Sequence, residues 1–301
     1  MSATTTPPAA APALGAGLAG GIARSARAEL LRLRRWPAVW VTLGAWMTMS
    51  VLFGYLFTYL SYTGDGTVGP GDGVASDQAL LAEMMPEAVP DVFLQGMPMF
   101  GGALMMVLGA LIAGNGYGWG TWKTVFSQGV RRGSGVGGSL AALTVVVVLT
   151  MAVTFALFLG LSSLIATTES QAMTWPELGS IAQAFAAGFA VLEMWALVGY
   201  LLGTLARGPA LAVGLGLVWS LVVENLLRGV GSLLSWVEAL TAVLPGTAAG
   251  SLVGSIIGAE SNGTPGVLDV VAGDRAAVTV VAWAVLALVG SVLLVTRRDV
   301  S

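Results

Sequence analysis

Residues 137–165 read GGSLAALTVVVVLTMAVTFALFLGLSSLI, a stretch without a single charged side chain. A helix of about 20 apolar residues is long enough to cross the hydrocarbon core of a bilayer. The apolar residues of this stretch are continuous and do not alternate with polar ones, as they would in a strand of a membrane barrel. The stretch therefore predicts a transmembrane helix.

Five further stretches have the same character, and their only charged residues are Glu193 and Glu224. Together they predict an all-α integral membrane protein with six transmembrane helices in residues 37–301. Residues 1–20, rich in Ala, Pro, Thr and Gly, predict a disordered tail. The six predicted spans are 38–60, 97–114, 137–165, 181–205, 209–227 and 276–295.

The composition of the 301-residue chain excludes several classes of function. Only 10% of the residues are charged and 56% are hydrophobic, whereas soluble domains carry about 25% charged residues. The chain has no Cys and no His, which excludes disulfides, Cys or His metal sites and Ser-His or Cys-His catalysis. A net charge of −3 gives no overall footprint for nucleic acid.

The basic residues predict the orientation, because cytoplasmic loops of membrane proteins carry an excess of Lys and Arg. With both termini in the cytoplasm, only Arg228 and Arg275 of the 13 basic residues lie outside. Acidic residues crowd the loop after the first span, namely Asp65, Asp72, Asp77, Glu83, Glu87 and Asp91. A single Lys beside abundant Ala, Gly and Val indicates a bacterial protein, so we expect the bacterial plasma membrane. The expected cytoplasmic residues are Arg24, Arg27, Arg32, Arg34, Arg35, Lys123, Arg131, Arg132, Arg207, Arg297 and Arg298.

Residues 239–259 are uncharged as well, but a seventh crossing there would place Arg297 and Arg298 outside. We therefore expect one or two short helices on or dipping into the outer face. Pro245 lies in this stretch, and glycines follow at 246, 250, 254 and 258. Glycines four residues apart form a flat face for close packing, although they are equally typical of a loop.

Residues 21–36 interleave leucines with arginines ahead of Pro37. On a helix this pattern gives a basic and an apolar face, which predicts an amphipathic interfacial helix along the inner leaflet. The alternative is a basic flank that only sets topology.

The loop between the second and third spans, residues 115–133, carries a further helix signal. Gly120 and Thr121 predict a helix start with Thr121 as the N-cap. Such a short amphipathic helix suits the docking of a soluble partner, and the alternative is a helix on the membrane surface with Trp at the headgroups. Its apolar face holds Trp122, Val125 and Phe126, and its polar residues are Lys123, Gln128, Arg131 and Arg132.

Three pieces of the sequence resemble one known family. They are Ala-Glu29-Leu-Leu-Arg-Leu-Arg-Arg, the run from Gly120-Thr121-Trp-Lys to Arg131-Arg132, and the terminal Arg297-Arg298-Asp299. With six spans, they look like a permease subunit of the type 2 ABC exporter family. The chain departs from the family pattern at Gly116, where members often carry Glu, and at Ser139, where they often carry Lys.

The resemblance implies that residues 115–133 form the coupling helix that contacts a separate ATP-hydrolysing subunit. It also implies two copies of that ATPase, with ATP and Mg²⁺ bound there, and a second permease copy or a homologue. Lys123-Thr124 follows Trp122 instead of Gly, so the chain lacks a P-loop. We therefore expect no cofactor on this chain and no enzymatic activity of its own.

Two carboxyl groups lie inside predicted spans, where an ionisable group is costly and marks a functional site by default. Glu193 lines a substrate path, carries a proton, or is a protonated group bonded to a neighbouring helix. Glu224 lies four residues before Arg228, a spacing that predicts an ion pair on one helix face. Besides the exporter, a proton-coupled secondary transporter using Glu193 and a non-transporting membrane scaffold or sensor stay open.

Overall fold

The structure is a computed structural model that describes residues 17–64, 76–231, 233–258 and 264–298. In these ranges it holds helices and no strand. Residues 1–16, Asp65, Asp72 and Asp299 lie outside them, so the predicted tail is described only from residue 17. Helix α1 begins at Leu18, and assigning residues 18–20 to a disordered tail was therefore wrong. The helical segments are α1 (Leu18–Arg35), α2 (Pro37–Val51), η1 (Leu52–Leu56), α3 (Phe57–Thr63), α4 (Asp77–Glu83), η2 (Pro86–Ala88), α5 (Val89–Gln95), η3 (Met97–Gly101), α6 (Gly102–Gly118), α7 (Thr121–Ser127), α8 (Arg132–Thr168), α9 (Leu178–Ala206), α10 (Pro209–Leu217), η4 (Val218–Val223), α11 (Glu224–Gly231), α12 (Ser235–Thr241), α13 (Pro245–Ile257) and α14 (Gly273–Arg297).

Six helices are long and apolar enough to cross a membrane, which confirms the predicted fold class and a multi-pass membrane protein. Three are single helices, α8, α9 and α14. Three are composite: α2–η1–α3, η3–α6 and α10–η4–α11. In each composite span a π-helical segment, η1, η3 or η4, interrupts or begins the α-helix.

The second, third and fourth spans form the core: in an apolar 18-residue stretch of each, 67%, 50% and 61% of the residues are buried, against 17–22% in the other three. Helices α6 and α9 approach most closely, because glycines stand where their backbones meet. A methyl group on Gly109 would overlap the carbonyl oxygen of Ala196, and one on Gly199 would overlap that of Met106. The outer spans cover this core and leave apolar side chains exposed, as lipid-facing helices do.

Helix α1 is amphipathic, as predicted, and leads to α2 through Trp36, which has extended backbone, and Pro37. Its inward face includes the buried Leu33. The helix packs along α8, where methyl groups on Gly137 and Gly138 would meet Ile22 and Ser25. Part of α1 is therefore covered by α8, while Leu31 stays 61% exposed, and the prediction that α1 lies along the inner leaflet stays open.

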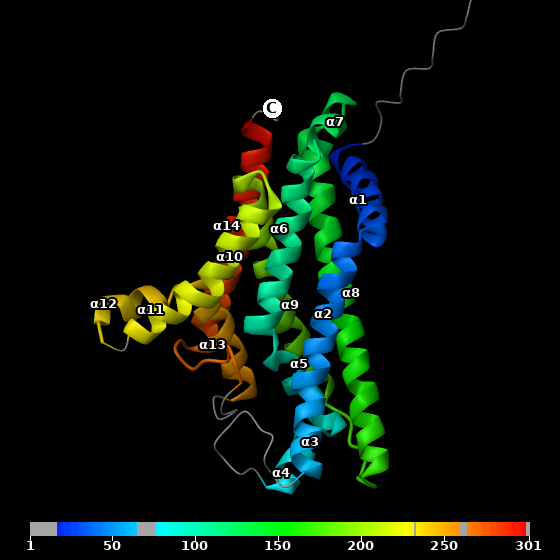
Figure 1. The fold of residues 1–301 in the computed structure, drawn as a ribbon, viewed down its shortest axis with the longest axis vertical. Helices are drawn as coiled ribbons and strands as arrows, with labels where there is room; N and C mark the ends of the chain where they lie inside the picture. Colours follow the sequence, from blue (N-terminus) through cyan, green and yellow to red (C-terminus); the bar gives the residue numbers. More distant parts are fainter. Residues whose placement is uncertain (1–16, 65–75, 232, 259–263, 299–301) are drawn as a thin grey trace, which may run out of the picture.

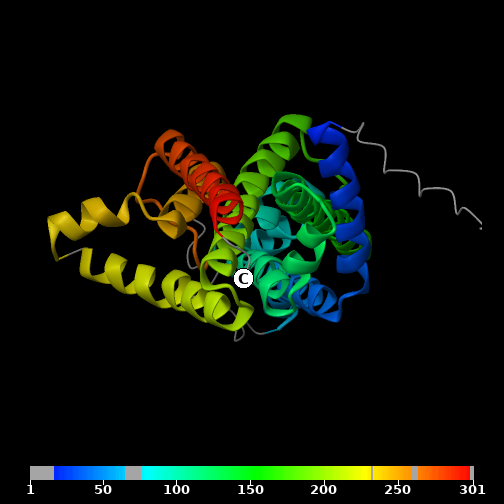
Figure 2. The ribbon, with the colours of Figure 1, turned by 90° about the horizontal axis from the view of Figure 1, so that it is seen from above.

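Most basic residues lie at one end of the bundle, and acidic residues lie at the opposite end. Figure 1 shows α1, α7 and the end of α14 at one end, which we call the basic end, and α3 and α4 at the other, the acidic end. The α9–α10 turn, with Arg207, also lies at the basic end, because Gly114 of α6 packs against Gly208 and Pro209. Seen from the basic end, α10, α11 and α12 lie on the side opposite α1 (Figure 2).

Residues 235–257 form the two short helices expected there, α12 and α13, with a 74° bend between them. The glycines of α13 are packed rather than free. Methyl groups on Gly250 and Gly254 would overlap the backbone at Gly266 and Leu268. The flat glycine face thus receives the segment that leads into α14, and not a neighbouring helix.

Candidate functional site

Helix α7 lies between the second and third spans at the basic end. The chain enters it at Gly120, whose φ of 65° lies in the left-handed region that favours glycine. Gly120 is the N-cap residue, and no side chain caps the helix. The prediction that Thr121 caps the helix is wrong, since Thr121 is already its first helical residue.

The apolar face of α7 points into the protein. Trp122 is 8% exposed, and its ring stacks on Phe126 with 5.4 Å between the centroids. Gly116 of α6 leaves space for the Trp122 indole, and Gly135 of α8 lies against the Phe126 ring. The departure from the family pattern at Gly116 therefore has a steric reason, because a larger side chain would displace Trp122. Trp122 is therefore not available to a partner, whereas Val125 and Phe126 are half-buried, and the docking of a partner by α7 stays a prediction.

The surface that α7 presents outward is polar and cationic. Lys123, Thr124, Ser127 and Gln128 are exposed, and so is Arg131 just before α8. One large apolar side chain accompanies them, Trp119, which is 61% exposed. Trp119 contacts Trp36 edge to face at 5.5 Å. Trp119 was not among the predicted site residues, although an aromatic residue between Gly118 and Gly120, at a helix junction, is a signal for it.

Arg132 is not part of that outward surface. Its guanidinium donates to the carbonyl oxygen of Arg298 at 2.8 Å and to that of Thr296 at 3.5 Å. It also lies over the Phe126 ring, 5.9 Å from the centroid. A cation at the last carbonyls of a helix is favourable, so Arg132 connects α7 and α8 to the end of α14.

A second polar cluster joins α1 to α8 nearby. Arg32 pairs with Glu29 at 2.5 Å, and the hydroxyl of Ser139 donates to the same carboxyl oxygen at 3.4 Å. Burial raises the pKa of Glu29, and the charge of Arg32 opposes this. Arg32 also lies over the ring of Trp36. Ser139, the second departure from the family pattern, is thus a partner of Glu29.

Glu193 is buried between α9 and α8. The hydroxyl of Thr144 lies 2.6 Å from one oxygen of its carboxyl group, and the same hydroxyl lies 3.2 Å from the carbonyl oxygen of Leu140. A hydroxyl has one hydrogen, so both contacts form together when Glu193 is protonated and donates to Thr144. The other oxygen of Glu193 has no partner among the described residues. A bond to a neighbouring helix was one of the three alternatives for Glu193, and its functional role stays a prediction.

Glu224 is buried where η4 passes into α11, and its surroundings differ from those predicted. The described residues contain no ion pair between Glu224 and Arg228. The indole N–H of Trp219 donates to Glu224 at 3.0 Å, and the carboxyl group lies against the first turn of α13. A methyl group on Gly246 would overlap it, and the backbone N–H groups of Gly246 and Thr247 face it. A negative group is favourable at a helix N-terminus.

No model of a known protein family matches the chain, and no curated protein matches it significantly. The described residues also contain no group of three or more acidic side chains that would hold a metal ion. The candidate site is therefore defined by geometry alone: α7 with its outward cations at the basic end, and two buried carboxyl groups within the spans.

Proposed function

We propose that this chain is the membrane-spanning permease subunit of an ABC exporter of the type 2 family. In this proposal a separate subunit hydrolyses ATP and binds the outward surface of α7 in the cytoplasm. Two such ATPases and a second permease, identical or homologous, complete the transporter. The chain itself supplies the path across the membrane and no catalytic group.

The observation that carries the proposal is the way α7 is attached. Its apolar face is inserted between α6 and α8 through Trp122 and Phe126, and Arg132 connects the same point to the end of α14. A displacement of α7 would therefore move three spans together, since packed interiors transmit strain. A helix that couples an external motor to the spans needs this kind of attachment.

The outward surface fits a partner with acidic groups. Lys123 and Arg131 are exposed on and beside α7, and Arg24, Arg27, Arg34 and Arg35 are exposed on α1. Charges of one sign speed the association of a partner of opposite sign. Trp119, exposed among these cations, is the kind of aromatic residue that dominates binding energy at interfaces.

One observation supports the second candidate, a proton-coupled transporter. Glu193 is a buried carboxyl group in the core, and one of its oxygens has no hydrogen-bond partner in the part of the chain that the structure describes. A proton relay uses such a group when it also has access to water. Its close bond to Thr144 favours a structural role, so we place this candidate second.

Purification of the tagged chain from its native membranes tests the proposal. We expect a P-loop protein with Mg²⁺-dependent ATPase activity to co-purify. Replacing both Lys123 and Arg131 with Glu reverses two exposed charges, and we expect at least about a tenfold loss of the co-purified activity. Arg275→Glu, an exposed position at the other end, is the matched control. Absence of ATPase from the wild-type preparation, or equal retention by the double variant, contradicts the proposal.

A further inference from the structure

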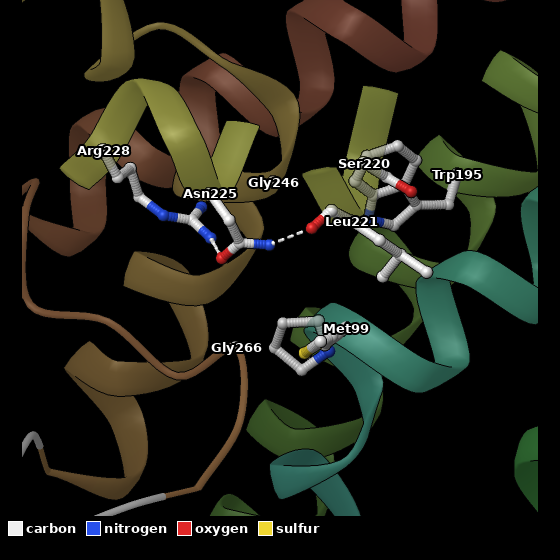
Figure 3. A pocket seen from close by; sticks show the side chains of 9 residues that line it. Met99, Trp195, Ser220, Leu221, Asn225, Arg228, Gly246 and Gly266 are labelled. Atoms are coloured by element: carbon white, nitrogen blue, oxygen red, sulfur yellow. Dashed lines mark hydrogen bonds between the residues drawn. The ribbon is translucent and has the colours of Figure 1, made fainter. Parts of the chain in front are cut away.

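A pocket lies where three spans meet the first turn of α13 (Figure 3). It is lined in part by Gly246, against which the carboxyl group of Glu224 packs. The enclosed space of the pocket is small, about 20 Å³ for water-sized groups, and the rest of the hollow is open to the surroundings. Its walls come from segments far apart in the sequence, namely η3, α9, η4 with α11, and α13. Six of the lining residues carry the inference: Met99, Trp195, Ser220, Leu221, Asn225 and Arg228.

Arg228 supplies the charge of this pocket. Its guanidinium donates to the side-chain oxygen of Asn225 at 2.5 Å and to the hydroxyl of Thr247 at 3.4 Å. Both partners are neutral, and they fix the orientation of the guanidinium. Since an Arg side chain has five N–H donors, these two bonds leave donors for a ligand. Asn225 is itself held by the carbonyl oxygen of Leu221, so the arrangement is preorganised.

The nearest carboxyl group does not occupy these donors. One oxygen of Glu224 accepts from Trp219, and the other lies against Gly246 without a hydrogen-bond partner among the described residues. Glu224 forms no ion pair with Arg228 in the described part of the chain. A half-buried cation inside a membrane span is costly unless an anion accompanies it. Glu224 is near enough for its charge to act on Arg228, but the two groups make no contact of ion-pair length, so the guanidinium keeps donors for a second anionic group.

Two further donors lie at the other end of the pocket. Figure 3 places Trp195 and Ser220 on the side opposite Arg228. The indole N–H of Trp195 and the hydroxyl of Ser220 are buried and have no hydrogen-bond partner among the described residues. Trp195 is only 2% exposed. A buried donor without a partner is unfavourable, and oxygen atoms of a ligand would satisfy both groups.

The remaining walls are apolar, with Met99 and Leu221 facing the same space. Two walls belong to π-helical segments, η3 and η4, and such segments are frequent at functional sites. In the span that carries Leu221, only 17% of an apolar 18-residue stretch is buried, so the apolar part of a bound molecule would continue along a lipid-facing helix. The lining thus combines donors for an anion with surface for an apolar chain.

We propose that this pocket binds the anionic headgroup of an amphiphile, a phosphate or carboxylate on an apolar chain, with Arg228 as the counter-charge. Binding itself is independent of any ATPase. That the bound amphiphile is the exported substrate rests on the proposed function. Such a ligand would pair with the cation, accept hydrogen bonds from the two donors that lack a partner among the described residues, and cover the apolar wall.

The test titrates the purified full chain, in neutral maltoside detergent, with dodecyl phosphate and follows binding by calorimetry. Wild type is expected to bind it more tightly than dodecylphosphocholine and to give no signal with inorganic phosphate. Arg228→Gln removes the charge and should weaken binding at least about tenfold. Arg275→Gln, the matched control, should bind as wild type. Equal binding by wild type and Arg228→Gln overturns the proposal, and so does binding of inorganic phosphate as tight as that of dodecyl phosphate.

A second variant decides the outcome if Arg228→Gln fails to fold. Leu221→Trp fills the pocket without changing its charge, and it should abolish binding of dodecyl phosphate; unchanged binding overturns the proposal. Competition in phosphatidylcholine nanodiscs distinguishes two sources of the ligand. If phosphatidylglycerol displaces dodecyl phosphate, the ligand of the pocket is an anionic membrane lipid. If dodecyl phosphate stays bound, the ligand is an amphiphile other than the membrane lipids. None of these binding measurements needs ATP. A negative result therefore contradicts the ligand proposal and leaves the proposed docking of an ATPase untouched.

Discussion

Single residues decide how two carboxyl groups are held inside this membrane protein. At Gly246 the missing side chain leaves the space that the carboxyl group of Glu224 occupies, so the acid lies against the N-terminus of α13 instead of Arg228. Glu193 is held by Thr144, whose hydroxyl lies 2.6 Å from one oxygen of the carboxyl group. In both cases the partner comes from another helix. Sequence spacing along one helix therefore predicted the wrong partner for Glu224.

Glu193→Gln distinguishes a structural carboxyl group from a proton carrier. Gln cannot titrate, and its amide N–H can still donate to the Thr144 hydroxyl, so we expect ATP-driven export from vesicles to stay within about twofold of wild type. Glu193→Ala removes the contact and should lower the unfolding free energy by about 1–3 kcal/mol. The two readouts are export with MgATP or with a pH gradient as the sole energy source, and thermal unfolding in detergent. Export driven by the gradient alone, and abolished in Glu193→Gln, contradicts the structural role.

At the scale of elements, the sequence predicts the six spans well, because long apolar runs dominate the energetics of a chain in a bilayer. It predicts poorly whatever depends on contacts between elements. The stripe of Trp122 and Phe126 has the spacing of a docking face, but whether it faces a partner or α6 depends on Gly116 and Gly135. The π-helical segments η1, η3 and η4 have no comparable signal in the pattern of apolar residues.

The contact between α6 and α9 offers a direct test of the packing. Gly199→Ala would place a methyl group on the Met106 carbonyl, and backbone cannot move aside as a flexible side chain does. We expect a loss of about 1–3 kcal/mol in unfolding free energy, measured as a lower midpoint of thermal unfolding in detergent. Gly160→Ala on α8, where nothing lies within 4 Å, is the control and should unfold as wild type. Equal midpoints for the two variants would contradict the backbone contact.

At the scale of the whole molecule, charge and packing give one consistent picture. Both polar clusters, around Arg132 and around Glu29, lie at the basic end and connect α1, α7, α8 and the end of α14. The acidic end carries exposed carboxylates on α4 and α5. This asymmetry was predictable from the sequence, because the positions of basic residues follow directly from the order of the spans. The network that joins these elements was not, since it depends on side chains brought together only by folding.

Site-directed crosslinking in native membranes tests the central claim, that α7 docks a separate ATPase. The chain has no Cys, so a single Gln128→Cys on the exposed side of α7 and a single Ser76→Cys at the acidic end can each carry a photoreactive group. Our account predicts that Gln128→Cys joins the chain to a P-loop protein that binds ATP, and that Ser76→Cys does not. A P-loop protein crosslinked from Ser76→Cys, or none crosslinked from Gln128→Cys, would contradict it.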